Sequence, residues 1–227
     1  MPHSRPSAEW SWTVLPTTER RVALTIDAGD TAEGADRMLR ALVDSGATAT
    51  FFLAGIWVER FPALARDIAA RYRVGNHTYG HEFLTSLPDA LVEEEITRGE
   101  RVIKAALRID PKPLFRFPYA DFDARTTAIA RRLGYTPIGW TVDTAGWRGV
   151  AGGMSVERVL QLVVRGLRPG AIYLIHIGAA TDGATIDADM LPTAIREIRN
   201  RGYGFATIDE FMSSVPRRLP EDAAYVG

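Results

Sequence analysis

Three of the four histidines in this 227-residue chain lie where they could take part in hydrolytic chemistry. His77 and His81 are four residues apart, a spacing that can place two imidazoles on one face of a helical turn, where both could bind one divalent cation. His176 follows the apolar run at residues 171–175, where a buried strand would open into a cleft. His3 lies in a polar, proline-rich N-terminal segment and is not expected to take part.

Other side chains with catalytic potential also lie where apolar runs end. Asp27 closes the first such run, Arg116 the fourth, Asp143 the fifth and His176 the sixth, and the His77–His81 pair follows the third. In a parallel β/α barrel the carboxyl ends of the strands meet at one mouth, so we expect these residues to be neighbours.

These residue types suit metal-assisted hydrolysis of an amide or ester. Two neutral imidazoles would bind a divalent metal such as Zn²⁺ and leave positions open for water and substrate. A carboxylate beside the bound water would remove its proton, and Asp27 is the best-placed candidate. His176 would protonate the leaving group, while Arg116 and Asp143 would orient and tune these groups, unless they only form an ion pair that closes the barrel.

The elements that must position these residues alternate along the chain from about residue 20. We expect strands at residues 21–26, 48–53, 71–75, 114–117, 136–142, 171–176 and 204–208. We expect helices at residues 35–42, 62–70, 124–133, 155–167 and 190–201, and a long amphipathic helix ending near residue 107 that begins after a capping box at residues 86–89. This alternation predicts a parallel sheet, either a nearly closed seven-stranded β/α barrel or an open doubly wound sheet.

No repeat or linker divides the chain, so we expect one domain at residues 19–213, with a leader at 1–18 and a polar tail at 214–227. A formal charge of −1 gives no electrostatic reason to expect nucleic acid as a partner. The absence of cysteine excludes disulfides and thiolate metal sites. No apolar run is long enough to span a bilayer, and the N-terminus lacks the apolar region of a signal peptide.

Five ordered motifs between about residues 21 and 212 resemble those of the polysaccharide deacetylases, the NodB-homology or carbohydrate esterase family 4 group. The family's Thr-Phe-Asp-Asp-Gly is similar to residues 25–29, and its Asp-x-x-Asp-Trp to residues 143–147. Its His-Ser/Thr-x-x-His, Arg-x-Pro-Tyr and Leu-x-His motifs are matched at residues 77–81, 116–119 and 174–176.

The resemblance implies a distorted (β/α)7 barrel that removes acetyl groups from sugar polymers with Zn²⁺, Co²⁺ or a similar metal. It implies an acetylated glycan as the partner, no membrane span, a monomer, and an extracytoplasmic or secreted location. By position it makes Asp27 the base, His77 and His81 metal ligands, and His176 the acid. It also implies that Arg116 holds Asp27, that the backbone N–H of Tyr119 stabilises the oxyanion, and that Trp147 and Leu174 wall the acetyl pocket.

Two positions depart from the family pattern. The family's metal-binding Asp is Ala28 here, in an Asp-Ala-Gly variant of the first motif, and the carboxylate that tunes the acid histidine is Gly146. Asp27 itself, Asp30, Glu33 or water could complete the metal site, and Asp143 could replace the tuning carboxylate. We expect a rearranged branch of active enzymes. A glycan-binding pseudoenzyme and a hydrolase of small amides or imides are the alternatives.

Overall fold

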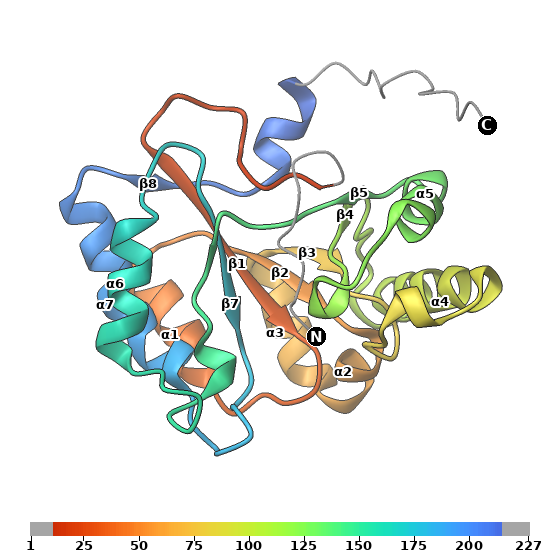
Figure 1. The fold of residues 1–227 in the computed structure, drawn as a ribbon, viewed down its shortest axis with the longest axis horizontal. Coiled ribbons are helices and arrows are strands. Elements are labelled where there is room, and N and C mark those ends of the chain that lie inside the picture. The colour runs from red at the N-terminus through yellow and green to blue at the C-terminus, as the bar shows by residue number, and fades with distance from the viewer. Residues whose placement is uncertain (1–10, 215–227) are drawn as a thin grey trace.

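The computed structural model describes residues 11–214 and contains a curled, entirely parallel sheet covered by helices (Figure 1). The strands follow the order β5-β4-β3-β2-β1-β7-β6, and β8 pairs with the start of β1. Their bounds are β1 Arg21–Ala28, β2 Thr50–Leu53, β3 Arg73–Asn76, β4 Leu114–Phe115, β5 Thr136–Pro137, β6 Val142–Asp143, β7 Ile172–His176 and β8 Gly204–Phe205. This is the predicted α/β fold, with the parallel sheet curled into an incomplete barrel.

An N-terminal segment lies between the two end strands of this sheet. The backbone N–H of Trp12 donates to Pro137 O at 2.9 Å, and its carbonyl accepts from Gly139 N at 2.8 Å. Three residues on, Leu15 N donates to Gly170 O at 2.8 Å, and the Leu15 side chain is fully buried. Residues 12–15 therefore join the β5 side of the barrel to the loop that precedes β7.

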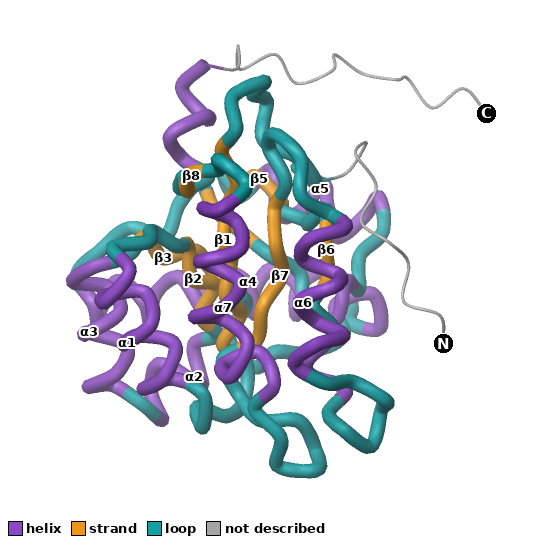
Figure 2. The backbone as a smooth tube through the Cα atoms, turned by 90° about the vertical axis from the view of Figure 1, so that its left-hand side faces the viewer, coloured by secondary structure: helices purple, strands orange, loops and turns teal. Residues whose placement is uncertain are grey.

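Helices cover the outer face of the sheet, and α1, α6 and α7 pack together on one side of it (Figure 2). The helices are α1 Ala35–Ser45, α2 Gly55–Arg60, α3 Pro62–Arg71, α4 Asp89–Leu107, α5 Ala124–Arg132, α6 Val156–Arg165 and α7 Ile186–Asn200. Short 3-10 turns are η1 Leu84–Ser86, η2 Pro118–Ala120, η3 Gly146–Arg148 and η4 Asp209–Ser214.

The two faces of β1 show how the core is divided. Val22, Leu24 and Ile26 belong to the large cluster under the helices. Side chains alternate across a strand, so the residues between them face the inside of the barrel. Ala23 accordingly belongs to a smaller interior cluster, and the next interior position beyond Thr25 is occupied by Asp27.

Several predicted boundaries were wrong. The run at 136–142 is divided into β5 and β6, because its first part pairs with β4 and its end pairs with β7. Six-residue α2 was not predicted, and α7 begins four residues before the expected start. The capping box at 86–89 is absent, since α4 begins after Pro88 with no side-chain cap. The first helix runs past residue 42 to Ser45 and stops at Gly46, which adopts a left-handed conformation with φ 62°.

Within residues 11–214, none of the helices combines the length and apolarity that crossing a bilayer would require. Residues 1–10 of the predicted leader and 215–227 of the predicted tail lie outside the described part of the chain.

Candidate active site

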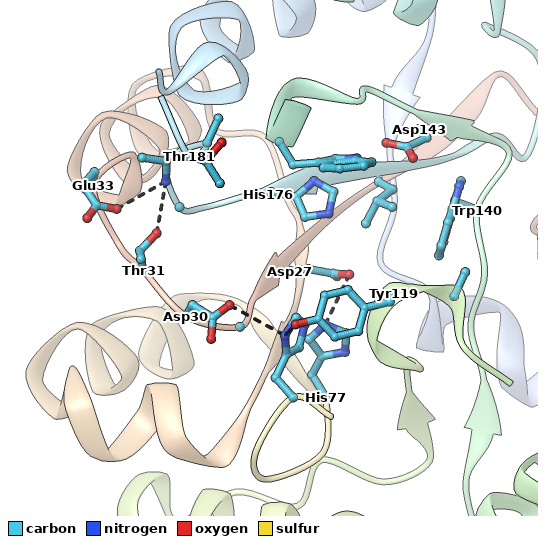
Figure 3. A pocket seen from close by; sticks show the side chains of 18 of the residues that line it. Asp27, Asp30, Thr31, Glu33, His77, Tyr119, Trp140, Asp143, His176 and Thr181 are labelled. Carbon is cyan, nitrogen blue, oxygen red and sulfur yellow. Dashed lines mark hydrogen bonds and ion pairs between the residues drawn. The ribbon is translucent and has the colours of Figure 1, made fainter. Parts of the chain in front are cut away.

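A cavity of about 640 Å³ opens at the carboxyl ends of the strands (Figure 3). It brings together residues from segments that are far apart in sequence. Every site residue expected from the sequence lines it except Arg116, which lies behind Asp27; the lining members are Asp27, His77, His81, Tyr119, Asp143, Trp147, Leu174 and His176. The predicted convergence of strand ends is therefore what the structure shows.

Asp27 is held from behind by a buried arginine. Arg116, 1% exposed, donates from one guanidinium nitrogen to Asp27 Oδ1 at 2.7 Å and to Thr25 Oγ1 at 2.8 Å. Its other nitrogens donate to the carbonyls of Ile138 and Gly139, at 3.1 and 3.0 Å. The guanidinium thereby engages one oxygen of Asp27 and leaves Oδ2 toward the cavity. Among the described residues no Arg116–Asp143 ion pair occurs, so that alternative role for the two residues is wrong.

The two motif histidines lie in a loop after β3, and not on the helical turn that their spacing suggested. Thr78 and His81 adopt left-handed conformations with φ of 66° and 60°, which a helix does not allow. The loop is fixed by backbone bonds, from His77 N to Leu53 O at 3.1 Å and from Gly55 N to Thr78 O at 2.9 Å. The turn, and not helical periodicity, brings the imidazoles together, with ring centroids 4.8 Å apart.

Both imidazoles are kept neutral. Burial lowers the pKa of His77, although the nearby Asp27 carboxylate opposes the shift. Burial and the two other cavity histidines lower the pKa of His81 to about 2. Neutral imidazole is the form that binds metal.

The tautomer of His77 follows from its partner. Nδ1 lies 2.8 Å from the carbonyl oxygen of Arg116, which can only accept, so Nδ1 carries the proton and Nε2 has a free lone pair. That Nε2 faces Asp27 Oδ2 at 3.6 Å. Two acceptors that face each other in a buried site would be stabilised by a cation between them.

The donor set fits a divalent cation bound by His77 and His81, while the remaining ligands are not assembled. Across residues 11–214, no group of three His, Cys, Asp or Glu side chains is arranged to hold a metal ion. Ala28 is fully buried in the cluster under the helices and does not line the cavity. Asp30 does line it, with Oδ2 3.9 Å from His81 Nδ1. Asp27 as third ligand stays a prediction.

An aromatic group forms one wall of the cavity. The Tyr119 hydroxyl lies 3.0 Å from His81 Nδ1, and Phe83 stacks on the Tyr119 ring with centroids 4.1 Å apart. Tyr119 has φ 57°, a left-handed conformation that a bulky residue seldom adopts. Trp147, 43% exposed, lines the cavity together with Leu174.

His176, at the end of β7, has a carboxylate neighbour that the sequence did not identify. Its Nδ1 lies 3.6 Å from Oδ2 of Asp187, which is 3% exposed at the start of α7. Burial alone would lower the pKa of His176, but Asp187 together with the Asp27 and Asp143 carboxylates outweighs this effect and raises it. Asp143, the expected tuning residue, lines the cavity, and burial raises the pKa of its carboxyl.

Comparison with known proteins agrees with this geometry. The polysaccharide deacetylase family model matches residues 15–138. A peptidoglycan-N-acetylglucosamine deacetylase of Bacillus cereus is 28% identical over 206 residues, which cover 89% of this chain and 72% of the relative.

Two solved structures are also similar. The Bc1960 peptidoglycan N-acetylglucosamine deacetylase superposes with a TM-score of 0.82 at 26% identity, over 92% of this chain and 95% of that one. BA3943 of Bacillus anthracis, a CE4 family pseudoenzyme, superposes with a TM-score of 0.76 at 30% identity, over 85% of this chain and 65% of that one. A mutant of BA3943 has restored enzymatic activity.

Proposed function

Because the chain belongs to the polysaccharide deacetylase family, we propose that it is a metal-dependent hydrolase that removes acetyl groups from an acetylated glycan of the peptidoglycan, chitin or acetylxylan type. The observation that supports this most is the single cavity that joins Asp27, the His77–His81 pair and His176. These supply a base, a metal-binding pair and an acid around one space.

The base and the acid lie on neighbouring strands. Asp27 and His176 are register partners in β1 and β7, so their side chains leave the sheet next to each other. Arg116 holds Oδ1 of Asp27, which leaves Oδ2 to accept a proton from the attacking water. The raised pKa of His176 favours the protonated imidazole, the form that can donate to the departing sugar amine or hydroxyl.

The other residues bind and orient the acetyl group. A divalent cation held by His77 and His81 would supply a polarised water and a Lewis acid for the acetyl carbonyl. The Tyr119 backbone N–H would donate to the oxygen on which negative charge develops. Trp147 and Leu174 provide apolar surface for the acetyl methyl group.

The proposal is tested by acetate release from N-acetylated glycan oligomers and acetylxylan. We expect release that EDTA abolishes and added Zn²⁺ or Co²⁺ restores. His77→Ala and His81→Ala should abolish it, while His3→Ala, a change outside the motifs, should leave it unchanged. Full activity of His81→Ala would contradict the assignment.

Metal titration separates the three candidate carboxylate ligands. If Asp27 acts as the base alone, Asp27→Asn should lose turnover and retain the Kd for Zn²⁺. If Asp30 or Glu33 completes the site, Asp30→Asn or Glu33→Gln should weaken Zn²⁺ binding, and Asp36→Asn, an exposed change in the first turn of α1, serves as the control. A rise in Kd confined to Asp27→Asn would make Asp27 a ligand.

A glycan-binding pseudoenzyme is the second candidate, and Ala28 is the observation that favours it. The first motif lacks its metal-binding carboxylate, and BA3943, at 30% identity, is a pseudoenzyme. This candidate predicts that calorimetry detects glycan binding, while no acetate is released whichever divalent metal is added. It also predicts that acetate release appears only in the Ala28→Asp variant. Acetate release by the unaltered chain would exclude it.

A further inference from the structure

Asp187 is a buried carboxylate whose ionic partner is the imidazole of His176. The side chain is 3% exposed in the first turn of α7, and within the described residues no lysine or arginine lies within ion-pair distance of it. Oδ2 accepts from the backbone N–H of His176 at 2.9 Å and from Thr144 Oγ1 at 3.0 Å. A buried charge needs a partner, and the group that can supply positive charge here is His176.

Two polar atoms at this contact lack hydrogen-bond partners. His176 Nδ1 and Asp187 Oδ1 are both buried without a partner among the described residues. Nδ1 lies 3.6 Å from Asp187 Oδ2, just beyond hydrogen-bond length. A small rotation of the ring would let Nδ1–H donate to this carboxylate, which directs Nε2 away from Asp187 and toward the cavity.

The space that Asp187 fills exists because residue 146 is glycine. A Cβ built on Gly146 would lie 2.2 Å from Asp187 Oδ1 and 2.5 Å from Cγ, an impossible contact. A side chain at position 146 and the Asp187 carboxylate therefore exclude each other. The first turn of α7 places at His176 the negative charge that the 3-10 turn η3 cannot provide.

Asp143 does not make this contact. Its Oδ1 accepts from the backbone N–H of Ala145 at 2.7 Å, and no ion pair joins it to His176 within the part of the chain that the structure describes. The shared hydrogen bonds of His176 N and Thr144 fix Asp187 against the histidine backbone, whereas nothing comparable ties Asp143 to the imidazole.

We propose that Asp187 is the positioning residue of His176, holding the imidazole in the tautomer with Nδ1 protonated and Nε2 facing the cavity. The catalytic part of this inference rests on the proposed deacetylase function. The positional part does not, so the two can be tested separately. Asp187 does not line the cavity and acts only through His176.

Nitrogen NMR of labelled histidine tests the positional part in active and inactive protein alike. At a pH where His176 is neutral, we expect Nδ1 to be the protonated nitrogen. In Asp187→Ala the ring should revert toward the tautomer mixture of a free histidine. Asp189→Asn, which changes an exposed neighbour on the same helix, should leave the signal unchanged. An Nε2-protonated ring in the unaltered chain, or no change in Asp187→Ala, would overturn the proposal.

Kinetics test the catalytic part. Asp187→Asn should lower kcat for acetate release about 10- to 100-fold with little change in KM, as losses of such supporting groups do. Gly146→Asp alone should disrupt the site, because the two carboxylates overlap, and Gly146→Asp with Asp187→Gly should recover most of kcat. Unchanged kcat in Asp187→Asn, or no recovery in a double variant that folds, would overturn the catalytic role. Absence of acetate release by the unaltered chain would refute the proposed function. The NMR measurement would still test whether Asp187 positions His176.

Discussion

Replacement of the buried Arg116 tests whether this residue holds the base in place. Arg116→Met would replace the guanidinium side chain with an apolar one of similar length. This change removes the ion pair with Asp27. The carboxylate, 7% exposed, would then lose its only arginine ion-pair partner among the described residues and lie beside the neutral His77. Breaking a buried pair by removing one partner costs about 3–5 kcal/mol.

That cost is large enough to measure in two ways. In a domain of this size each kcal/mol lowers the melting temperature by about 2–4 °C, so the loss should be on the order of 10 °C. Urea unfolding should show the same 3–5 kcal/mol as a lower midpoint. Acetate release should fall as well, because Asp27 loses its fixed orientation.

A control and a double variant sharpen the test. Arg101→Met removes an exposed pair with Glu94, which should cost less than about 1 kcal/mol. Asp27→Asn combined with Arg116→Met should be more stable than the sum of the single changes predicts, because the lone charge is gone; a coupling of about 1–3 kcal/mol is expected. A loss below 1 kcal/mol in Arg116→Met, or strict additivity, would refute the reasoning.

Three further predictions concern the histidine loop. Gly29→Ala would place a Cβ 2.8 Å from the His81 ring, so Zn²⁺ affinity by calorimetry should fall while the melting temperature changes little; unchanged affinity would contradict this. Gly99→Ala would press a Cβ to 2.5 Å from Thr78 O and should cost about 1–3 kcal/mol in urea unfolding. Since burial keeps His77 and His81 neutral in the fold, acid favours the unfolded chain, which binds more protons. Between pH 6.5 and 5, in EDTA, stability should therefore fall by up to about 1.4 kcal/mol per pH unit for each histidine. His81→Gln should reduce that slope, and an equal slope in both proteins would count against the burial argument.

The sequence predicted which residues meet, because parallel strands bring their carboxyl ends together. Asp27 and His176 illustrate this, since both end apolar runs and the structure pairs their strands in register. The pairing of Arg116 with Asp27 was implied by the family resemblance, and the structure confirms it.

What escaped the sequence depends on contacts across space. The His77–His81 turn relies on left-handed residues that are not glycine, so no local signal marked it. Asp187 belongs to no motif, and its role depends on a void left by Gly146, 41 residues away. The only sequence signal was the missing carboxylate at position 146, for which the sequence suggested Asp143 as a replacement, whereas the structure places Asp187 beside His176.

The most direct test of the central claim is acetate release by the purified, metal-depleted chain, measured before and after Zn²⁺ or Co²⁺ is added. The proposed function predicts no acetate without metal, turnover of an N-acetylated glycan with metal, and none in His77→Ala under either condition. Glycan binding without acetate release, whichever divalent metal is added, would contradict the proposed function. It would identify a glycan-binding protein on a deacetylase fold.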